Sequence, residues 1–237
     1  MTEELRLGPP VDGREALDPR RGPLEGRFVS LEPIDAEVHG GPLWRAAGGA
    51  ERVWTYLPYG PFAEERQMRE WLRTCTGSED PRFYTVVSRA AGPIGMASFL
   101  NVDTAMRHLE LGHIWYAPGA QRTEANTETV HLMLREAFDV LGHRRVEWKC
   151  DALNARSRAA ALRLGFTFEG VFRNHMIVKG RNRNTAWYAM IDEEWPRARS
   201  ALERWLEAEP TSRPPLASLR DQPAEGQTLA GPRPPRS

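Results

Sequence analysis

Cysteine is scarce in this chain of 237 residues, neither sign of charge is in excess, and long apolar runs are missing. The two cysteines, Cys75 and Cys150, are too few for a disulfide framework and lack metal-ligand spacing, so we expect neither disulfides nor a metal site. No run of apolar residues reaches membrane-spanning length, and the N-terminus has no continuous apolar signal core. The formal net charge is zero, which predicts no nucleic-acid or membrane partner. These absences predict a soluble, cytoplasmic protein.

Composition divides the chain into three parts. Residues 1–23 mix charge, proline and glycine without periodicity and predict a flexible arm. Residues 210–237 are rich in proline and predict a disordered tail on the same grounds. Between them, residues 24–209 predict one domain.

Within that domain, the spacing of apolar residues predicts alternating strands and helices. Alternation with a period of two marks strands, and apolar stripes at helical spacing mark helices. We expect strands at 26–33, 83–88, 93–102, 108–116, 145–151, 166–173 and 185–191. We expect helices at 35–54, interrupted by Gly40, Gly41 and Pro42, and at 63–74, 126–141, 154–165 and 193–209.

The turn at residues 118–128, PGAQRTEANTE, lies between a predicted strand and the start of a predicted helix. Unpaired amides at a helix start carry partial positive charge and suit a pyrophosphate, and Arg122 could add a direct contact. The alternative is an ordinary polar loop without a ligand.

A second signal follows the strand at 145–151. Asn154 predicts a helix N-cap, Ser157 follows three residues later, and Gly165 ends that helix before Phe166. Here the chain resembles the GNAT acyltransferase superfamily, and more closely its branch of ribosomal-protein N-terminal (alanine) acetyltransferases. The resemblance covers residues 24–206 and rests on ELGHIW, QRTxxNTE, RVEWKCDALNARSRAA, RLGFTFEGVFR and EEWP, in that order.

The resemblance implies an α/β fold, with a mixed, mostly antiparallel sheet of about seven strands flanked by helices. It implies that the family's fourth and fifth strands, here 108–116 and 145–151, splay apart to hold the pantetheine of acetyl-CoA or another acyl-CoA. No metal is needed, because backbone N–H groups polarise the carbonyl and the amine attacks directly. The implied cofactor-binding residues are Trp115, Tyr116, Gln121, Arg122, Thr123, Glu124, Ala125, Asn126, Thr127, Asn154 and Ser157.

Three positions depart from the family pattern. Gln121 fits the start of the phosphate loop, but Glu124 and Asn126 stand where glycine, or glycine or alanine, is expected. A carboxylate beside a pyrophosphate is repulsive unless it turns into solvent, and a Cβ limits backbone approach. Ala161 stands where many members place a tyrosine acid. The resembling branch instead uses a serine at the position of Ser157, whose weakly acidic hydroxyl could hydrogen-bond the leaving sulfur.

The base and the acceptor pocket have open alternatives. Glu110 on the splayed strand is the candidate base, directly or through water, and His175 is its rival. Either could instead be an ordinary surface residue. The aromatic turn WTYLPYGPF at 54–62 offers Tyr56 and Tyr59 as substrate contacts, or else packs between helices.

The sequence as a whole predicts an N-acyltransferase that moves an acetyl group from acetyl-CoA to a primary amine of a protein N-terminus or small molecule, acting as a monomer or homodimer. The alternative is a non-catalytic module with the same fold that binds acyl-CoA. A third hypothesis is transfer of a different acyl group, or use of an aminoacyl donor.

Overall fold

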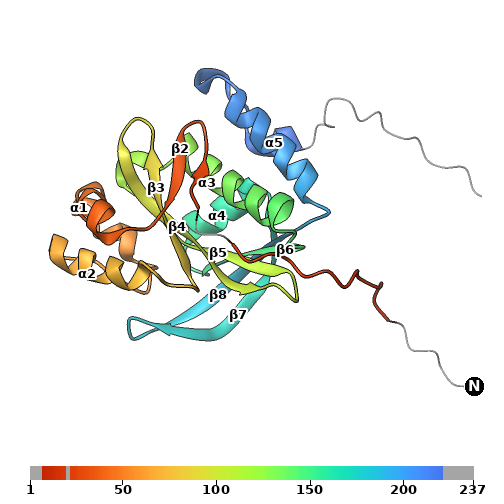
Figure 1. Ribbon diagram of the computed structural model, residues 1–237, viewed down its shortest axis with the longest axis horizontal. Coiled ribbons are helices and arrows are strands. Elements are labelled where there is room, and N and C mark those ends of the chain that lie inside the picture. Colours follow the sequence, from red (N-terminus) through yellow and green to blue (C-terminus); the bar gives the residue numbers. More distant parts are fainter. Residues whose placement is uncertain (1–6, 20–21, 221–237) are drawn as a thin grey trace, which may run out of the picture.

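A single sheet organises the computed structural model, which describes residues 7–19 and 22–220 (Figure 1). Within these residues, eight strands follow the spatial order β1-β2-β3-β4-β5-β6-β8-β7. Neighbouring strands are antiparallel except β5 and β6, which are parallel. The strands are β1 (Leu24–Glu25), β2 (Val29–Pro33), β3 (Arg82–Ser88), β4 (Gly92–Asp103), β5 (His108–Tyr116), β6 (Arg145–Asp151), β7 (Thr167–Val178) and β8 (Arg181–Ile191).

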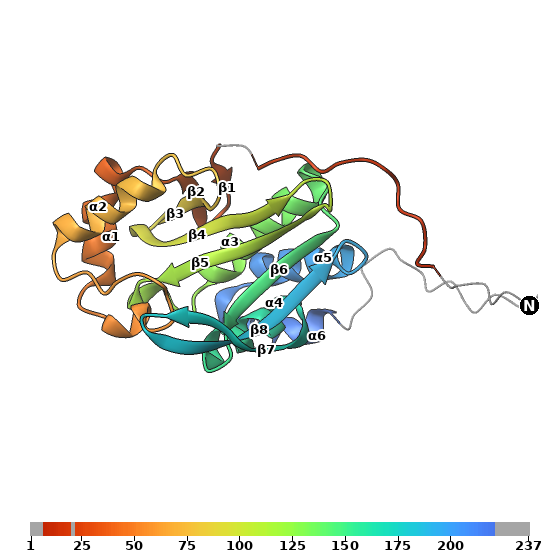
Figure 2. The ribbon, with the colours of Figure 1, turned by 90° about the horizontal axis from the view of Figure 1, so that it is seen from below.

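Helices cover the sheet unequally. They are α1 (Ala36–Ala47), α2 (Glu65–Cys75), α3 (Glu124–Arg135), α4 (Ala155–Leu164), α5 (Trp195–Glu207) and α6 (Leu216–Arg220). Shorter turns are η1 (Glu51–Trp54), η2 (Pro118–Ala120), η4 (Pro210–Ser212) and the π-helical η3 (Glu136–Val140). Figure 1 shows α1 and α2 on one side of β2–β4 and α3, α4 and α5 on the other. Among the described elements, no helix lies in front of β5, β6 and β8 in Figure 2.

The main core lies between the sheet and the group formed by α3, α4, α5 and α6. Alternate residues of each central strand face it, as the period of two requires. Phe99, Leu109, Leu111 and Tyr188 are at most 1% exposed there. A second apolar cluster joins α1 and α2 to Met96 and Trp115 on the opposite face. On β5 and β6 the side chains that face away from the main core include Glu110, Glu147 and Lys149, and that polar face is where a site can form.

The predicted fold is confirmed, and several element boundaries are not. The break predicted at Gly40, Gly41 and Pro42 is wrong, because α1 runs through all three. Asp35 caps this helix, and a side chain at Gly41 would come within 2.9 Å of Glu65 on α2, so the glycine allows close packing. Strands β7 and β8 are longer than predicted, because their hairpin extends beyond the sheet.

The two ends of the chain also contain ordered contacts. In the segment from Pro210, for which the sequence predicts disorder, α6 buries Leu216 and Leu219 against the core. In the predicted arm, Ala16 is buried and its N–H donates to the carbonyl of Thr104. Residues 1–6, 20–21 and 221–237 of these two segments lie outside the described structure. No helix in the described ranges is both long and apolar enough to span a bilayer.

Candidate active site

Strands β5 and β6 form a V-shaped opening. They pair in parallel only from His108–Arg145 to Leu111–Trp148. Beyond that point β5 follows β4 and β6 follows β8, so no ladder pair joins the ends of β5 and β6 in the described structure. Two residues of β5, His113 and Ile114, oppose one residue of β4, and His113 has φ +52°. This bulge bends β5 away from β6, which confirms the predicted splay.

The predicted phosphate turn lies at the open end of β5. Gln121 donates from Nε2 to the carbonyl of Tyr116 at 3.1 Å and so ties the turn to the strand. Thr123 is the N-cap of α3 and accepts from the N–H of Ala125. The remaining first-turn amides lack acceptors within the helix, as in any α-helix. Arg122 is exposed with φ +65°. The turn therefore leads into the start of α3 at the open end of β5, and its binding of a pyrophosphate stays a prediction.

The Glu124 carboxylate is compensated by a residue from outside the predicted site. Arg213 places Nη1 3.2 Å from Glu124 Oε2, and its guanidinium lies 4.5 Å from the centre of the Trp205 ring. The Arg213 side chain is only 10% exposed. Sequence reasoning missed Arg213 because it lies in the segment predicted to be disordered.

Ser157 lies beside Trp148, the last residue of β6 that pairs with β5. Asn154 caps α4 by accepting from the N–H of Ser157 at 3.1 Å, as predicted from the sequence. Trp148 donates from Nε1 to Ser157 Oγ at 2.9 Å. Because Oγ accepts that hydrogen bond, the hydroxyl can donate its own hydrogen, and the Cys150 thiol is within its reach. Ala161 is fully buried and presents only a methyl group.

Glu110 lies on β5 one residue before the pairing with β6 ends. Its side chain faces the polar, helix-free side of the sheet and is 8% exposed. Lys149 Nζ lies 3.0 Å from Glu110 Oε2 and 2.8 Å from Glu147 Oε2, and Asn101 donates to Glu110 at 2.7 Å. Burial raises the pKa of Glu110, although Lys149 and Asn101 oppose that rise. The alternation of β6 places Lys149 on this face, and that signal could have identified it.

His175 reaches the same face from a bulge in β7. Three residues of β7, from Arg173 to His175, oppose Asn184 alone on β8. His175 Nδ1 lies 3.0 Å from Thr185 Oγ1, and its ring lies 5.9 Å from that of Trp187. Trp187 in turn lies 3.8 Å below Lys149 Nζ. Both candidate bases therefore border one surface, with Glu110 buried at the splay and His175 exposed on the hairpin.

The aromatic turn at 54–62 contacts both arms of the opening. Trp54 packs 4.9 Å from Trp115 at the end of β5, and Tyr56 donates to the carbonyl of Leu153 beyond β6 at 3.2 Å. Tyr59 stacks on Trp71 at 3.9 Å and lies 5.6 Å from His113. Burial lowers the pKa of His113 to about 4, so this cluster is uncharged at pH 7. Tyr56 thus lies at the rim, while Tyr59 packs in the cluster.

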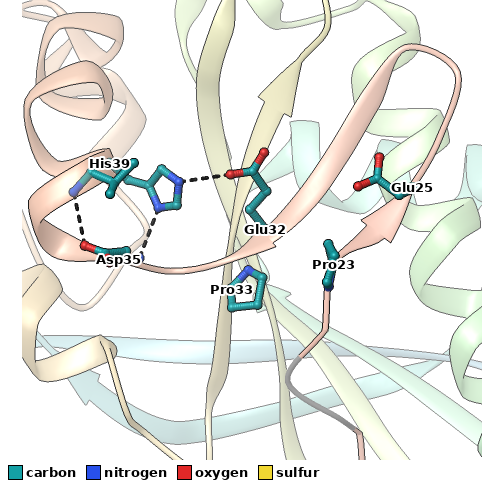
Figure 3. A pocket seen from close by; sticks show the side chains of 7 residues that line it. Pro23, Glu25, Glu32, Pro33, Asp35 and His39 are labelled. Atoms are coloured by element: carbon teal, nitrogen blue, oxygen red, sulfur yellow. Dashed lines mark hydrogen bonds and ion pairs between the residues drawn. The ribbon is translucent and has the colours of Figure 1, made fainter.

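A separate hollow of about 430 Å³ lies beside β2 and the start of α1 (Figure 3). In it, His39 Nδ1 accepts from the N–H of Asp35 and Nε2 faces Glu32 at 3.3 Å. These contacts join the helix start to the strand. None of the predicted site residues lines this hollow. The described residues also contain no cluster of three or more side chains suited to a metal ion.

Comparison with known proteins finds relatives that match most of this chain. The family model of the acetyltransferase (GNAT) domain matches residues 29–167. The structure is similar to that of a GCN5-related N-acetyltransferase from Brucella melitensis, with a TM-score of 0.85 and 39% identity over 88% of this chain and 98% of that one. A GNAT-family protein from Chromobacterium violaceum has a TM-score of 0.75 and 38% identity over 82% of this chain and all of its own.

A curated relative is the protein of Bacillus subtilis (strain 168) named "Putative ribosomal N-acetyltransferase YdaF". It is 31% identical over 101 residues, which span 43% of this chain and 55% of the relative. The chain therefore matches only about half the length of this relative.

Proposed function

Since the chain belongs to the GNAT acetyltransferase family, we propose that it transfers an acetyl group from acetyl-CoA to a primary amine, either a protein N-terminus or a small molecule. One observation carries the proposal: β5 and β6 separate after Leu111 and Trp148 and leave their facing backbone edges unpaired. Unpaired N–H and C=O groups need partners, and a pantetheine arm offers amide groups that can supply them.

The residues around the opening fit the two ends of such a donor. The amides at the start of α3, with Arg122 beside them, suit the pyrophosphate. Ser157, at the start of α4, lies where β6 leaves β5 and fits the sulfur end. The Arg213–Glu124 ion pair reduces the repulsion that Glu124 would otherwise exert on the phosphates.

The proposed chemistry is one direct transfer. Acetyl-CoA supplies the activated thioester. The amine nitrogen forms a bond to the acetyl carbon, the carbon–sulfur bond breaks, and Glu110 takes the proton that the amine loses. Burial favours the protonated form of Glu110, so this carboxylate is a better proton acceptor than an exposed one. Ser157 donates a hydrogen bond to the leaving sulfur. His175 is the rival base, on the same face.

Calorimetry with acetyl-CoA and a thiol-release assay with a mixture of peptide and small-molecule amines test this proposal. We expect saturable binding and amine-dependent release of free thiol. Binding without thiol release would instead support the non-catalytic module, a hypothesis to which Ala161 lends weight. No binding at millimolar acetyl-CoA would overturn both.

Two variants separate the candidate bases. Glu110→Gln should lower kcat by about 10²- to 10³-fold with acetyl-CoA affinity preserved. His175→Ala should change kcat by less than about threefold if Glu110 is the base. The opposite pattern would assign the base to His175.

A further inference from the structure

The hairpin formed by β7 and β8 carries an excess of positive charge, although the net charge of the whole chain is zero. From Gly170 to Thr185 it carries four cationic residues and no aspartate or glutamate. Its formal charge is therefore +4, and the rest of the chain carries −4, because the total is zero. The four residues are Arg173, Lys179, Arg181 and Arg183.

These cations have no carboxylate partners in the described parts of the chain. Arg145, on the neighbouring β6, shows the contrast, because it pairs with both Glu147 and Glu169. Arg183 is half-buried, and its Nε is buried without a hydrogen-bond partner. Leaving a buried donor unpaired is costly, so a negatively charged group bound here would stabilise it.

The hairpin also borders the proposed site at two places. At its tip, Lys179 Nζ donates to the carbonyl of Trp54 at 2.9 Å and so reaches the aromatic turn. Figure 2 shows the hairpin of β7 and β8 extending towards the side of the molecule where α1 and α2 lie. At its bulge, His175 contacts Trp187, whose ring lies beneath the Lys149 that binds Glu110. A hollow of about 870 Å³ lies at this bulge, lined by Phe172, Arg173, Asn174, His175 and Asn184.

A peptide fits this surface better than a small amine or a nucleic acid. Among the described residues, β7 is the last strand of the sheet, and its outer edge can pair with an extended segment. Phe172, Met176 and Ile177 on it are 52%, 43% and 83% exposed, which offers apolar contacts between the charges. We propose that the β7–β8 hairpin binds the acceptor and selects peptides whose N-terminal segment is acidic. This inference rests on the proposed function and names the substrate class of the same site.

Two matched peptides test the inference, each with the same N-terminal residue and either acidic or neutral residues after it. The acidic peptide should have a kcat/KM roughly tenfold higher, the size expected from a few exposed ion pairs, mainly through a lower KM. That preference should shrink as salt rises from ~0.05 to ~0.5 M, because exposed charges are screened. In the double variant Arg173→Gln with Arg181→Gln, the ratio should fall towards one. Arg135→Gln, an exposed arginine on α3, should keep it.

A binding measurement distinguishes this inference from the proposed function. Fluorescence anisotropy of the same peptides, labelled at their C-termini, reports docking whether or not acetyl transfer occurs. Tighter binding of the acidic peptide that the double variant abolishes supports the inference even if no thiol is released. Equal binding and equal kcat/KM for the two peptides overturn it, and so does tighter binding of a short polyuridine RNA than of the acidic peptide.

Discussion

The ammonium group of Lys149 lies 3.0 Å from the carboxylate of Glu110 and 3.8 Å above the ring of Trp187. Lys149 therefore acts on the charge of the candidate base from beside the opening. Burial raises the pKa of Glu110, and Lys149 is the first of the groups that lower it. The balance between burial and this ion pair sets the pH at which Glu110 can accept a proton.

Replacing Lys149 with methionine should move the acid limb of the kcat/KM profile to higher pH. Without the ammonium group, only Asn101 would oppose the effect of burial, so the pKa of Glu110 would rise further. A larger fraction of Glu110 would then be protonated and unable to act near neutral pH. The measurement is kcat/KM against pH, with Lys149→Arg as the control that keeps the charge. An acid limb that stays in place in Lys149→Met would remove Glu110 from the role of base.

Ser157→Ala should lower kcat roughly tenfold while the affinity for acetyl-CoA changes less than twofold, because the proposed contact of this hydroxyl with the donor is the hydrogen bond to the leaving sulfur. The same change leaves Trp148 Nε1 without its acceptor and should cost about 1 kcal/mol of unfolding free energy. Urea denaturation measures that cost separately. Ser157→Thr keeps the hydroxyl and is the control, and a kcat equal to wild type in Ser157→Ala would contradict the role.

The strands could be predicted from the sequence because local patterns determine them, whereas the opening was expected from the family resemblance. The alternation of Val146, Trp148 and Cys150 with Glu147, Lys149 and Asp151 identifies β6 and assigns each side chain to a face. The caps at Asn154 and Gly165 likewise depend on residues one helix turn away. Such signals need no knowledge of distant parts of the chain.

Contacts between distant residues could not be predicted. Arg213 lies 89 positions from Glu124, and its neighbours in the sequence are prolines and polar residues that form no apolar pattern. Gly40 and Gly41 are poor helix formers by themselves, yet α1 continues through them because α2 packs closely at that place. The bulge that brings His175 against Thr185 depends on the register between β7 and β8, which neither strand specifies alone.

Arg213→Met should weaken acetyl-CoA binding several-fold, although Arg213 lies outside the predicted site. The change leaves the Glu124 carboxylate unpaired at the start of α3, where it would repel the phosphates. Glu124→Gln added to Arg213→Met should restore the dissociation constant to within about twofold of wild type. Calorimetry with acetyl-CoA on wild type, the two single variants and the double variant gives the coupling free energy between Arg213 and Glu124. If Arg213→Met and the double variant lose the same acetyl-CoA affinity, Arg213 acts through its packing on Trp205 instead.

Glu128→Ala should lower the free energy of unfolding by about 3 kcal/mol. The carboxylate of Glu128 is buried on α3 and accepts hydrogen bonds from the N–H groups of Arg27, Phe28 and Val29 at 2.7, 2.6 and 2.7 Å. Alanine would leave these donors without an acceptor between the β1–β2 turn and the helix that carries the phosphate turn.

Urea denaturation of Glu128→Ala beside Glu207→Ala, an exposed glutamate at the end of α5, measures this effect. The control should lie within about 0.5 kcal/mol of wild type. A loss below about 1 kcal/mol in Glu128→Ala would mean that water replaces the carboxylate at the three N–H groups. In that case β2 would be held mainly by its pairing with β3, and Glu128 would not be the contact that fixes α3 against β2.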